Sequence, residues 1–141
     1  MQAIYATEFK EIGPEVEAFL EEKYLILFQV GAPPELAEMS VLHECSHMRE
    51  EPPAPGDVLE VGDREFRVTA VGEKAWKNVA ELGHAVFVFN GAREAEMPGQ
   101  ICLEEGAEGL AALVKPGVSL RMRAGAGIGA ARGGEDAARE S

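Results

Sequence analysis

Residues 43–47 read His-Glu-Cys-Ser-His and match the H-E-x-x-H pattern of zinc peptidases. On a helix, His43 and His47 would share one face and chelate a metal ion, and Glu44 would act as general base toward a metal-bound water. A second chemistry needs His43 alone. A neutral imidazole whose other ring nitrogen is held as a hydrogen-bond donor is a nucleophile, and it can carry a phosphoryl group without a metal. The secondary structure around residue 43 decides between the two.

The remaining candidates lie close to His43 in sequence or precede a later apolar run. His47 is followed by charged residues and most simply belongs to a loop, and Cys45 needs no function as a small thiol. His84 is either a hydrogen-bonded residue at a strand edge or a supporting residue beside His43. His43, Cys45, His47 and His84 could together form a Cys-His₃ zinc set. No second cysteine pair or downstream H-x-x-x-E run marks such a site, so we expect no metal and no cofactor.

Landmarks in the sequence recur with an offset of about sixty residues, which indicates a duplicated fold. Each half, about 3–62 and 63–122, reads as strand, short helix, strand, turn, strand and a last strand opened by Pro-Gly. Two strand-helix-strand pieces that resemble each other by chance are the alternative. The sequence predicts a mainly β fold, α+β in detail, that is one domain with a duplicated barrel-like core of two pseudo-symmetric halves. The clearest matching segments are 25–28 with 86–89, and 55–56 with 116–117.

The repeat also predicts the conformation around His43. Residues 34–43 alone have helical character, because apolar residues recur three apart after two prolines. The matching segment 96–103 contains a Pro-Gly pair, which would break a helix, and then strand-like residues. We therefore expect His43 on a strand or at its end.

A strand at this place removes the peptidase geometry. Residues four apart on a strand share a face, but Glu44 would point away from the face of His43 and His47. The residue that matches His43 in the second half is Leu103, so the scaffold itself does not require a polar group there. The nucleophile hypothesis is therefore the stronger of the two.

Composition limits the partners and the location. The 141 residues carry a formal net charge of −12, which argues against nucleic acid and suits a partner with a basic face. The two cysteines form no CxxC pair, so a reducing cytosol is expected. The N-terminus lacks the apolar core of a signal peptide, and the longest apolar run, 24–28, is too short to span a bilayer. The sequence predicts a cytoplasmic protein.

The C-terminal residues differ in composition from the rest of the chain. Residues 124–141 consist of small and charged residues, with Ile128 as the one large apolar side chain. Such a segment cannot bury enough surface to offset its ordering entropy. We expect a domain over residues 1–123, of a common size for one domain, and a flexible tail over 124–141.

Several segments between about Ala3 and Met122 are similar, in content and in order, to those of a known protein family. The chain resembles the glucitol/sorbitol-specific IIA component of the phosphoenolpyruvate-dependent sugar phosphotransferase system. The segments that carry the resemblance are Leu25-Ile26-Leu27-Phe28 with Gly31-Ala32-Pro33, Ser40-Val41-Leu42-His43, Pro55-Gly56-Asp57-Val58-Leu59, Val68-Thr69-Ala70-Val71-Gly72, Glu81-Leu82-Gly83-His84, and Phe89-Asn90-Gly91-Ala92 with Pro98-Gly99.

The resemblance implies a mainly β, duplicated barrel and a phosphoryl-carrying function. It makes His43 the residue that accepts a phosphoryl group from HPr and passes it to the IIB part of a glucitol/sorbitol permease, whose IIC part admits the hexitol. It makes His84 a supporting neighbour. A non-catalytic regulatory relative, which would keep the fold but not take up phosphate, is an alternative beside the zinc-dependent hydrolase. Cys45 stands where some relatives have a second histidine, and residues 48–53 depart from the usual continuation, so the surroundings of the nucleophile differ from the family pattern.

Overall fold

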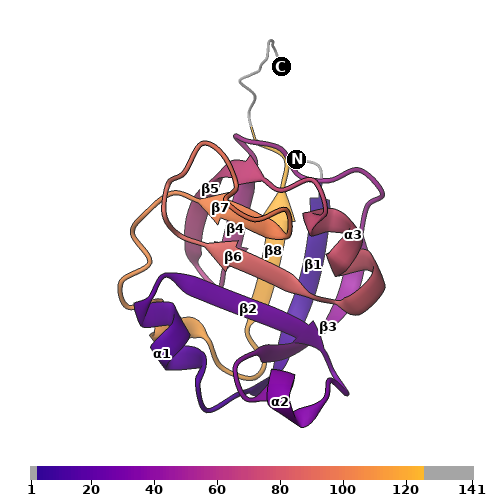
Figure 1. The fold of residues 1–141 in the computed structure, drawn as a ribbon, viewed down its shortest axis with the longest axis vertical. Coiled ribbons are helices and arrows are strands. Elements are labelled where there is room, and N and C mark those ends of the chain that lie inside the picture. The colour runs from indigo at the N-terminus through magenta and orange to yellow at the C-terminus, as the bar shows by residue number, and fades with distance from the viewer. Residues whose placement is uncertain (1–2, 126–141) are drawn as a thin grey trace.

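The chain folds into one closed β-barrel in the computed structural model, which describes residues 3–125 (Figure 1). Hydrogen-bonded neighbours around the barrel follow the order β1-β3-β2-β6-β7-β5-β4-β8, and β8 pairs with β1 to close it. The predicted mainly β, barrel-like domain is confirmed. The elements are β1 (Ala3–Ile12), α1 (Val16–Glu21), β2 (Tyr24–Gln29), α2 (Pro34–Ala37), β3 (Val41–Met48), β4 (Val58–Val61), β5 (Arg64–Val71), α3 (Ala75–Leu82), β6 (Ala85–Val88), β7 (Gln100–Leu103), the 3₁₀ helix η1 (Leu110–Leu113) and β8 (Ser119–Arg123).

The barrel interior is filled by every second residue of the strands. Leu25 and Leu27 of β2 lie opposite Phe87 and Ala85 of β6, and all four side chains are buried. This alternation follows from the two-residue period of a strand, which sends successive side chains to opposite faces. Residues of β2 and β6 between these positions therefore face outward.

The strand order has a two-fold regularity. If β1, β2, β3 and β4 are exchanged with β5, β6, β7 and β8, respectively, every pair of neighbouring strands in the barrel is still a pair of neighbours. The parallel pairs keep matching registers, with Leu27 opposite Val41 and Phe87 opposite Ile101, about sixty residues further along. The topology is that expected of two equivalent halves, and the duplication itself stays a prediction.

Two glycines allow the chain to pass close to itself at equivalent places. The Gly13 N–H donates to the Ser40 carbonyl (3.0 Å), and the Gly72 N–H donates to the Gln100 carbonyl (2.7 Å). A Cβ at either glycine would lie 2.2 Å from a carbonyl oxygen, of Ala37 in the first case and of Pro98 in the second. Only glycine fits such an approach.

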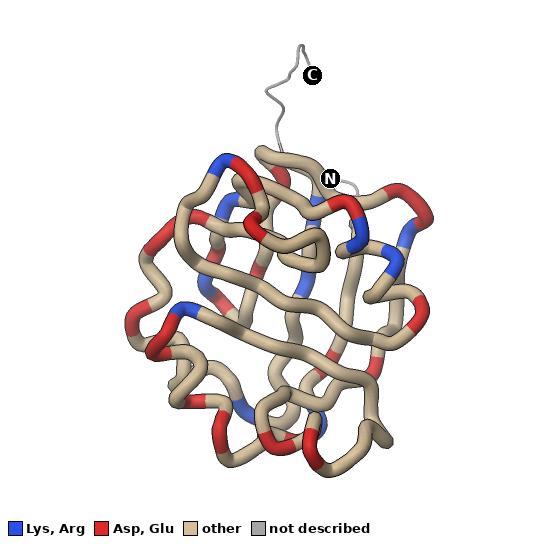
Figure 2. Tube along the Cα trace, viewed as in Figure 1, with Lys and Arg blue, Asp and Glu red and all other residues tan. Residues whose placement is uncertain are grey.

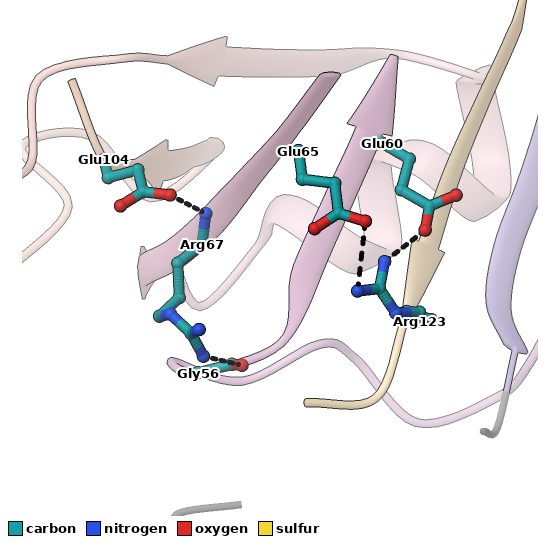
Figure 3. A network of polar contacts seen from close by, with 6 residues as sticks. All are labelled: Gly56, Glu60, Glu65, Arg67, Glu104 and Arg123. Carbon is teal, nitrogen blue, oxygen red and sulfur yellow. Dashed lines mark hydrogen bonds and ion pairs between the residues drawn. The ribbon is translucent and has the colours of Figure 1, made fainter. Parts of the chain in front are cut away.

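Charged residues link the neighbouring strands β8, β4 and β5 (Figure 3). The Arg123 guanidinium on β8 contacts the carboxylates of Glu60 on β4 and Glu65 on β5, the latter at 3.3 Å. Also on β5, the Arg67 backbone N–H donates to the carboxylate of Glu104, just after β7, at 2.8 Å. Arg123 and Glu60 are three-quarters buried, so this pair is screened less than an ordinary surface pair.

The segment around His43 is a strand, as the repeat predicts, and the helix needed by the peptidase motif is not formed. The expectation that His47 lies in a loop is wrong. β3 continues to Met48 because β1 pairs with it that far, with Tyr5 opposite Met48 and Ala6 opposite His47. The helical character of residues 34–43 is expressed only in α2, which ends at Ala37.

The predicted tail falls mostly outside the described residues. Its first two residues are described, and the Gly125 N–H donates to the Asp57 carboxylate at 3.0 Å. The domain boundary after residue 123 stays a prediction. Among residues 3–125, no helix is long and apolar enough to cross a membrane.

The close approach at Gly13 and Gly72 can be tested by Gly→Ala substitution. Each added methyl group would force a neighbouring carbonyl segment to move, so we expect Gly13→Ala and Gly72→Ala each to lower the free energy of unfolding by about 1–3 kcal/mol in urea titrations. Gly99→Ala is the control, because its Cβ would meet only the Asn78 amide nitrogen, at 3.1 Å. Equal midpoints for Gly72→Ala and Gly99→Ala would contradict the steric account.

Candidate functional site

His43 lies inside the barrel wall, on a strand bordered on both sides. β3 places it opposite Phe9 of β1 and Gln29 of β2, and its exposed fraction is 2 %. The side chain follows Val41 by two residues, and Val41 belongs to the core. An imidazole therefore occupies a position that the strand period assigns to the interior.

Both ring nitrogens of His43 have hydrogen-bond partners. Nε2 lies 2.7 Å from the Gly83 carbonyl oxygen, and Nδ1 lies 2.6 Å from the Thr7 hydroxyl and 3.4 Å from the Tyr5 hydroxyl. A carbonyl oxygen can only accept, so Nε2 carries the proton, and the Thr7 O–H donates to the lone pair of Nδ1. The partner atoms thus fix the tautomer of the ring.

Burial also sets the charge of the ring. Loss of solvent lowers the pKa of His43 from its ordinary 6.5, and the hydrogen bond to the Gly83 carbonyl offsets this only in part. At neutral pH the ring is therefore uncharged. An uncharged imidazole keeps a lone pair, which a nucleophile requires.

The turn between α3 and β6 covers the Nε2 side of the ring. Gly83 ends α3 in the left-handed conformation (φ 63°), and its N–H donates to the Val79 carbonyl at 3.0 Å. A Cβ at Gly83 would lie 2.7 Å from the Gln29 Cβ, so the turn is pressed against the end of β2. Glycine allows both the positive φ and this approach.

His84 ties the same turn to β2. Its ring stacks on Phe28, with centroids 4.1 Å apart and an interplanar angle of 15°. Its Nδ1 lies 3.3 Å from the Leu27 carbonyl oxygen, to which it donates. His84 is therefore a half-buried, hydrogen-bonded residue at a strand edge, and its neighbour Gly83 is the residue that contacts His43.

The other residues of the H-E-x-x-H segment are exposed. Glu44 is exposed and pairs with Lys10 at 3.7 Å. Cys45 is exposed, and its thiol donates to the His47 carbonyl at 3.3 Å, while the His47 Nε2 donates to the Ala3 carbonyl at 3.2 Å. His43 alone of this segment faces the interior. Within residues 3–125, no three His, Cys, Asp or Glu side chains are grouped so that they could hold a metal ion.

The sequence did not predict the three hydrogen-bond partners of His43, which are Tyr5, Thr7 and Gly83. Tyr5 and Thr7 belong to β1, where Tyr5, Thr7 and Phe9 are all buried at alternate positions. A hydroxyl on the inward face of an otherwise apolar strand was the available signal for Thr7. Gly83 contributes a backbone carbonyl, which every residue has, so no sequence pattern could have identified it.

The family is decided by comparison with known proteins. The family model described as "PTS system glucitol/sorbitol-specific IIA component" matches residues 4–119. The chain belongs to this family. Proteins named "PTS system glucitol/sorbitol-specific EIIA component" from Shigella flexneri and from Escherichia coli are each 38 % identical to it over 101 residues, which cover 72 % of this chain and 81 % of theirs.

A solved structure agrees with the fold of this IIA chain. The crystal structure of a PTS system IIA component from Enterococcus faecalis superposes with a TM-score of 0.65 and 22 % identity, over 82 % of this chain and 96 % of the other. At that identity the likeness shows the fold alone. The predicted family is confirmed, and membership makes the chain a component of a sugar phosphotransferase system with a phosphoryl-carrying role.

The pKa of His43 can be measured directly. The ring should titrate below pH 6.5 in NMR spectra of its carbon-bound protons, because burial opposes the charged form. Since the unfolded chain binds this proton first, the free energy of unfolding should fall as the pH drops below about 6.5 and level off below the folded pKa. His43→Asn should lack that share of the pH dependence. A ring that titrates at 6.5 or above would contradict the burial argument.

Zinc content tests the other chemistry of the H-E-x-x-H segment. Because the segment is a strand and Glu44 points away from His43, we expect the purified protein to contain far less than one zinc per chain. A chelator should leave the thermal midpoint unchanged. Stoichiometric zinc that is lost in both His43→Ala and His47→Ala would restore the metal site.

Proposed function

We propose that His43 is the phosphorylated residue of this IIA component, accepting the phosphoryl group from phospho-HPr and passing it to the IIB part of a glucitol/sorbitol permease. The single observation that carries the proposal is the pair of hydrogen bonds that hold a neutral, buried imidazole by both nitrogens. Its counterpart in the strand topology is the buried Leu103, so the histidine is not needed for packing. A residue kept in one tautomer and one orientation suits a reaction that depends on positioning.

The nitrogen that attacks is Nε2. Its hydrogen bond to Gly83 is only partly buried, whereas the bonds of Nδ1 to Thr7 and Tyr5 are buried, so Nε2 is the nitrogen nearer to the surface. In the closed site Nε2 carries the proton, so its lone pair is not free. The site must therefore open before the reaction can occur.

The reaction requires an exchange of tautomers. When the Gly83 carbonyl moves aside, Nε2 gives its proton to solvent water and Nδ1 takes up a proton from solvent water, so the ring stays neutral. Nδ1 then donates to the Thr7 hydroxyl oxygen, which keeps its own proton. The Nε2 lone pair forms the new N–P bond while the P–N bond to the donor histidine breaks, and that bonding pair returns to the donor imidazole. Transfer to the acceptor runs the same steps in the opposite direction. Thr7 holds the ring in both tautomers, since a hydroxyl can donate or accept.

His84 supports this site without touching the phosphoryl group. Its stacking on Phe28 and its bond to the Leu27 carbonyl hold the turn that carries Gly83. His84 is thus a positioning residue for the cover over Nε2. No cofactor or metal takes part in this proposal.

Mass spectrometry tests the proposal after incubation with phosphoenolpyruvate, enzyme I and HPr. We expect one added phosphoryl group that is labile in acid and stable in base, as a phosphoramidate is. His43→Ala should remove it, and the matched variant His47→Ala should keep it because that ring binds only the exposed Ala3 carbonyl. Labelling that persists in His43→Ala would refute the assignment.

A further inference from the structure

An uncharged, apolar face lies next to the α3–β6 turn, whose Gly83 carbonyl covers the His43 Nε2. The outward residues of the β2–β6 ladder are Tyr24 and Ile26 on β2, opposite Val88 and Val86 on β6, with Phe28 stacked on His84 beyond them. Figure 1 shows both strands toward the viewer with α1 and α3 at their ends, and no helix crosses in front of them. Tyr24, Ile26 and Val86 are partly exposed on this outer side, whereas Val88 is buried, so the exposed part of the ladder runs from Ile26 and Val86 toward Phe28.

Two exposed apolar side chains continue this face to the His43 site. Val30 has an exposed fraction of 43 %, and its N–H donates to the His43 carbonyl at 3.2 Å. Leu82 is 48 % exposed and directly precedes Gly83, whose carbonyl covers the His43 Nε2. Of the three large apolar residues exposed in residues 3–125, two thus flank the nucleophile.

The segments that form this face carry no charged side chains. Residues 24–34 and 82–92 contain no Asp, Glu, Lys or Arg, although the whole chain has a net charge of −12. Figure 2 shows the charges gathered on the other segments and β2 and β6 in the colour of uncharged residues. A phosphorylated partner that approaches over these two segments meets no carboxylate from them, whose repulsion would oppose the arrival of a phosphoryl group. The acidic residues that adjoin the site in sequence are Glu81 and Glu44, and Glu44 is paired with Lys10.

We propose that this face, the outer surface of β2 and β6 with Val30 and Leu82, is the docking surface for the phosphoryl donor protein, and that the donor presents an apolar surface around its own phosphohistidine. The proposal rests on His43 as the phosphoryl acceptor. The donor must bring its phosphorus to Nε2, so it must cover the residues that flank the α3–β6 turn. Burial of apolar side chains from both proteins would supply the affinity, with a few central contacts carrying most of it.

The test compares two phosphoryl donors on the same variants. Phospho-HPr has to dock, whereas phosphoramidate is small and needs no docking surface; its P–N bond breaks and releases ammonia as the bond to Nε2 forms. We expect Val30→Glu and Leu82→Glu each to lower kcat/KM with phospho-HPr by about tenfold or more. Val30→Ser and Leu82→Ser should lower it by a smaller factor and leave the phosphoramidate rate within about twofold of the wild type, because they add no charge that would repel the phosphoramidate anion.

Met97→Glu is the matched control. Met97 is the third exposed large apolar residue, at 57 %, and lies just before β7 on a different segment. The same change there should leave both rates unchanged, and thermal midpoints would confirm that all variants fold.

The outcomes separate the docking surface from the proposed function. Unchanged phospho-HPr rates in Val30→Glu and Leu82→Glu, with normal labelling of His43, would overturn the docking surface alone. Absence of label on His43 from either donor would overturn the proposed function. A wild-type dimer that Val30→Glu converts to a monomer without slowing phospho-HPr would assign the face to a second copy of the chain and refute the proposal.

Discussion

The partly buried hydrogen bond from the His43 imidazole to the Gly83 carbonyl joins β3 to the turn between α3 and β6. It selects the tautomer with the proton on Nε2, and the Thr7 hydroxyl at Nδ1 is the complementary partner. A buried polar ring without these partners would destabilise the fold, because each unpaired nitrogen would have lost its water. In the proposed function the same bond also keeps the Nε2 lone pair of His43 unavailable while the turn is in place, so one contact would serve both stability and phosphoryl transfer.

The site arises where the two halves differ. The strand order is unchanged by the exchange of the halves, and the glycines at 13 and 72 make equivalent close approaches to the chain. His43 and Leu103 occupy matching strand positions, and both are buried. A scaffold that packs a leucine at one of these positions can place an imidazole at the other, provided that neighbouring segments supply its hydrogen bonds. β1 supplies the Thr7 hydroxyl, and the α3–β6 turn supplies the Gly83 carbonyl.

A phosphoryl carrier needs few catalytic side chains of its own. Transfer between two histidines depends on alignment and on charge stabilisation, and part of both can come from the partner protein. This agrees with a site that has one imidazole, two hydroxyls and one carbonyl. It also agrees with an apolar surrounding. Residues 24–34 and 82–92 carry no charged side chain although the whole chain has a net charge of −12, so the charge of the whole chain is a poor guide to these segments beside His43.

The sequence by itself determined the β-rich barrel, the family and the strand that carries His43, because strand periodicity, Pro-Gly breaks and ordered motifs are local patterns. It failed at His47, since the length of β3 depends on pairing with β1, a segment about forty residues away. Only the tertiary structure decided that His43 is buried, which nitrogen carries its proton and what covers that nitrogen. Those properties depend on Thr7 and on the carbonyl of Gly83, which approach the ring only when the barrel closes. Every residue has a backbone carbonyl, so the sequence of residue types could not show that the carbonyl of Gly83 would lie next to the ring.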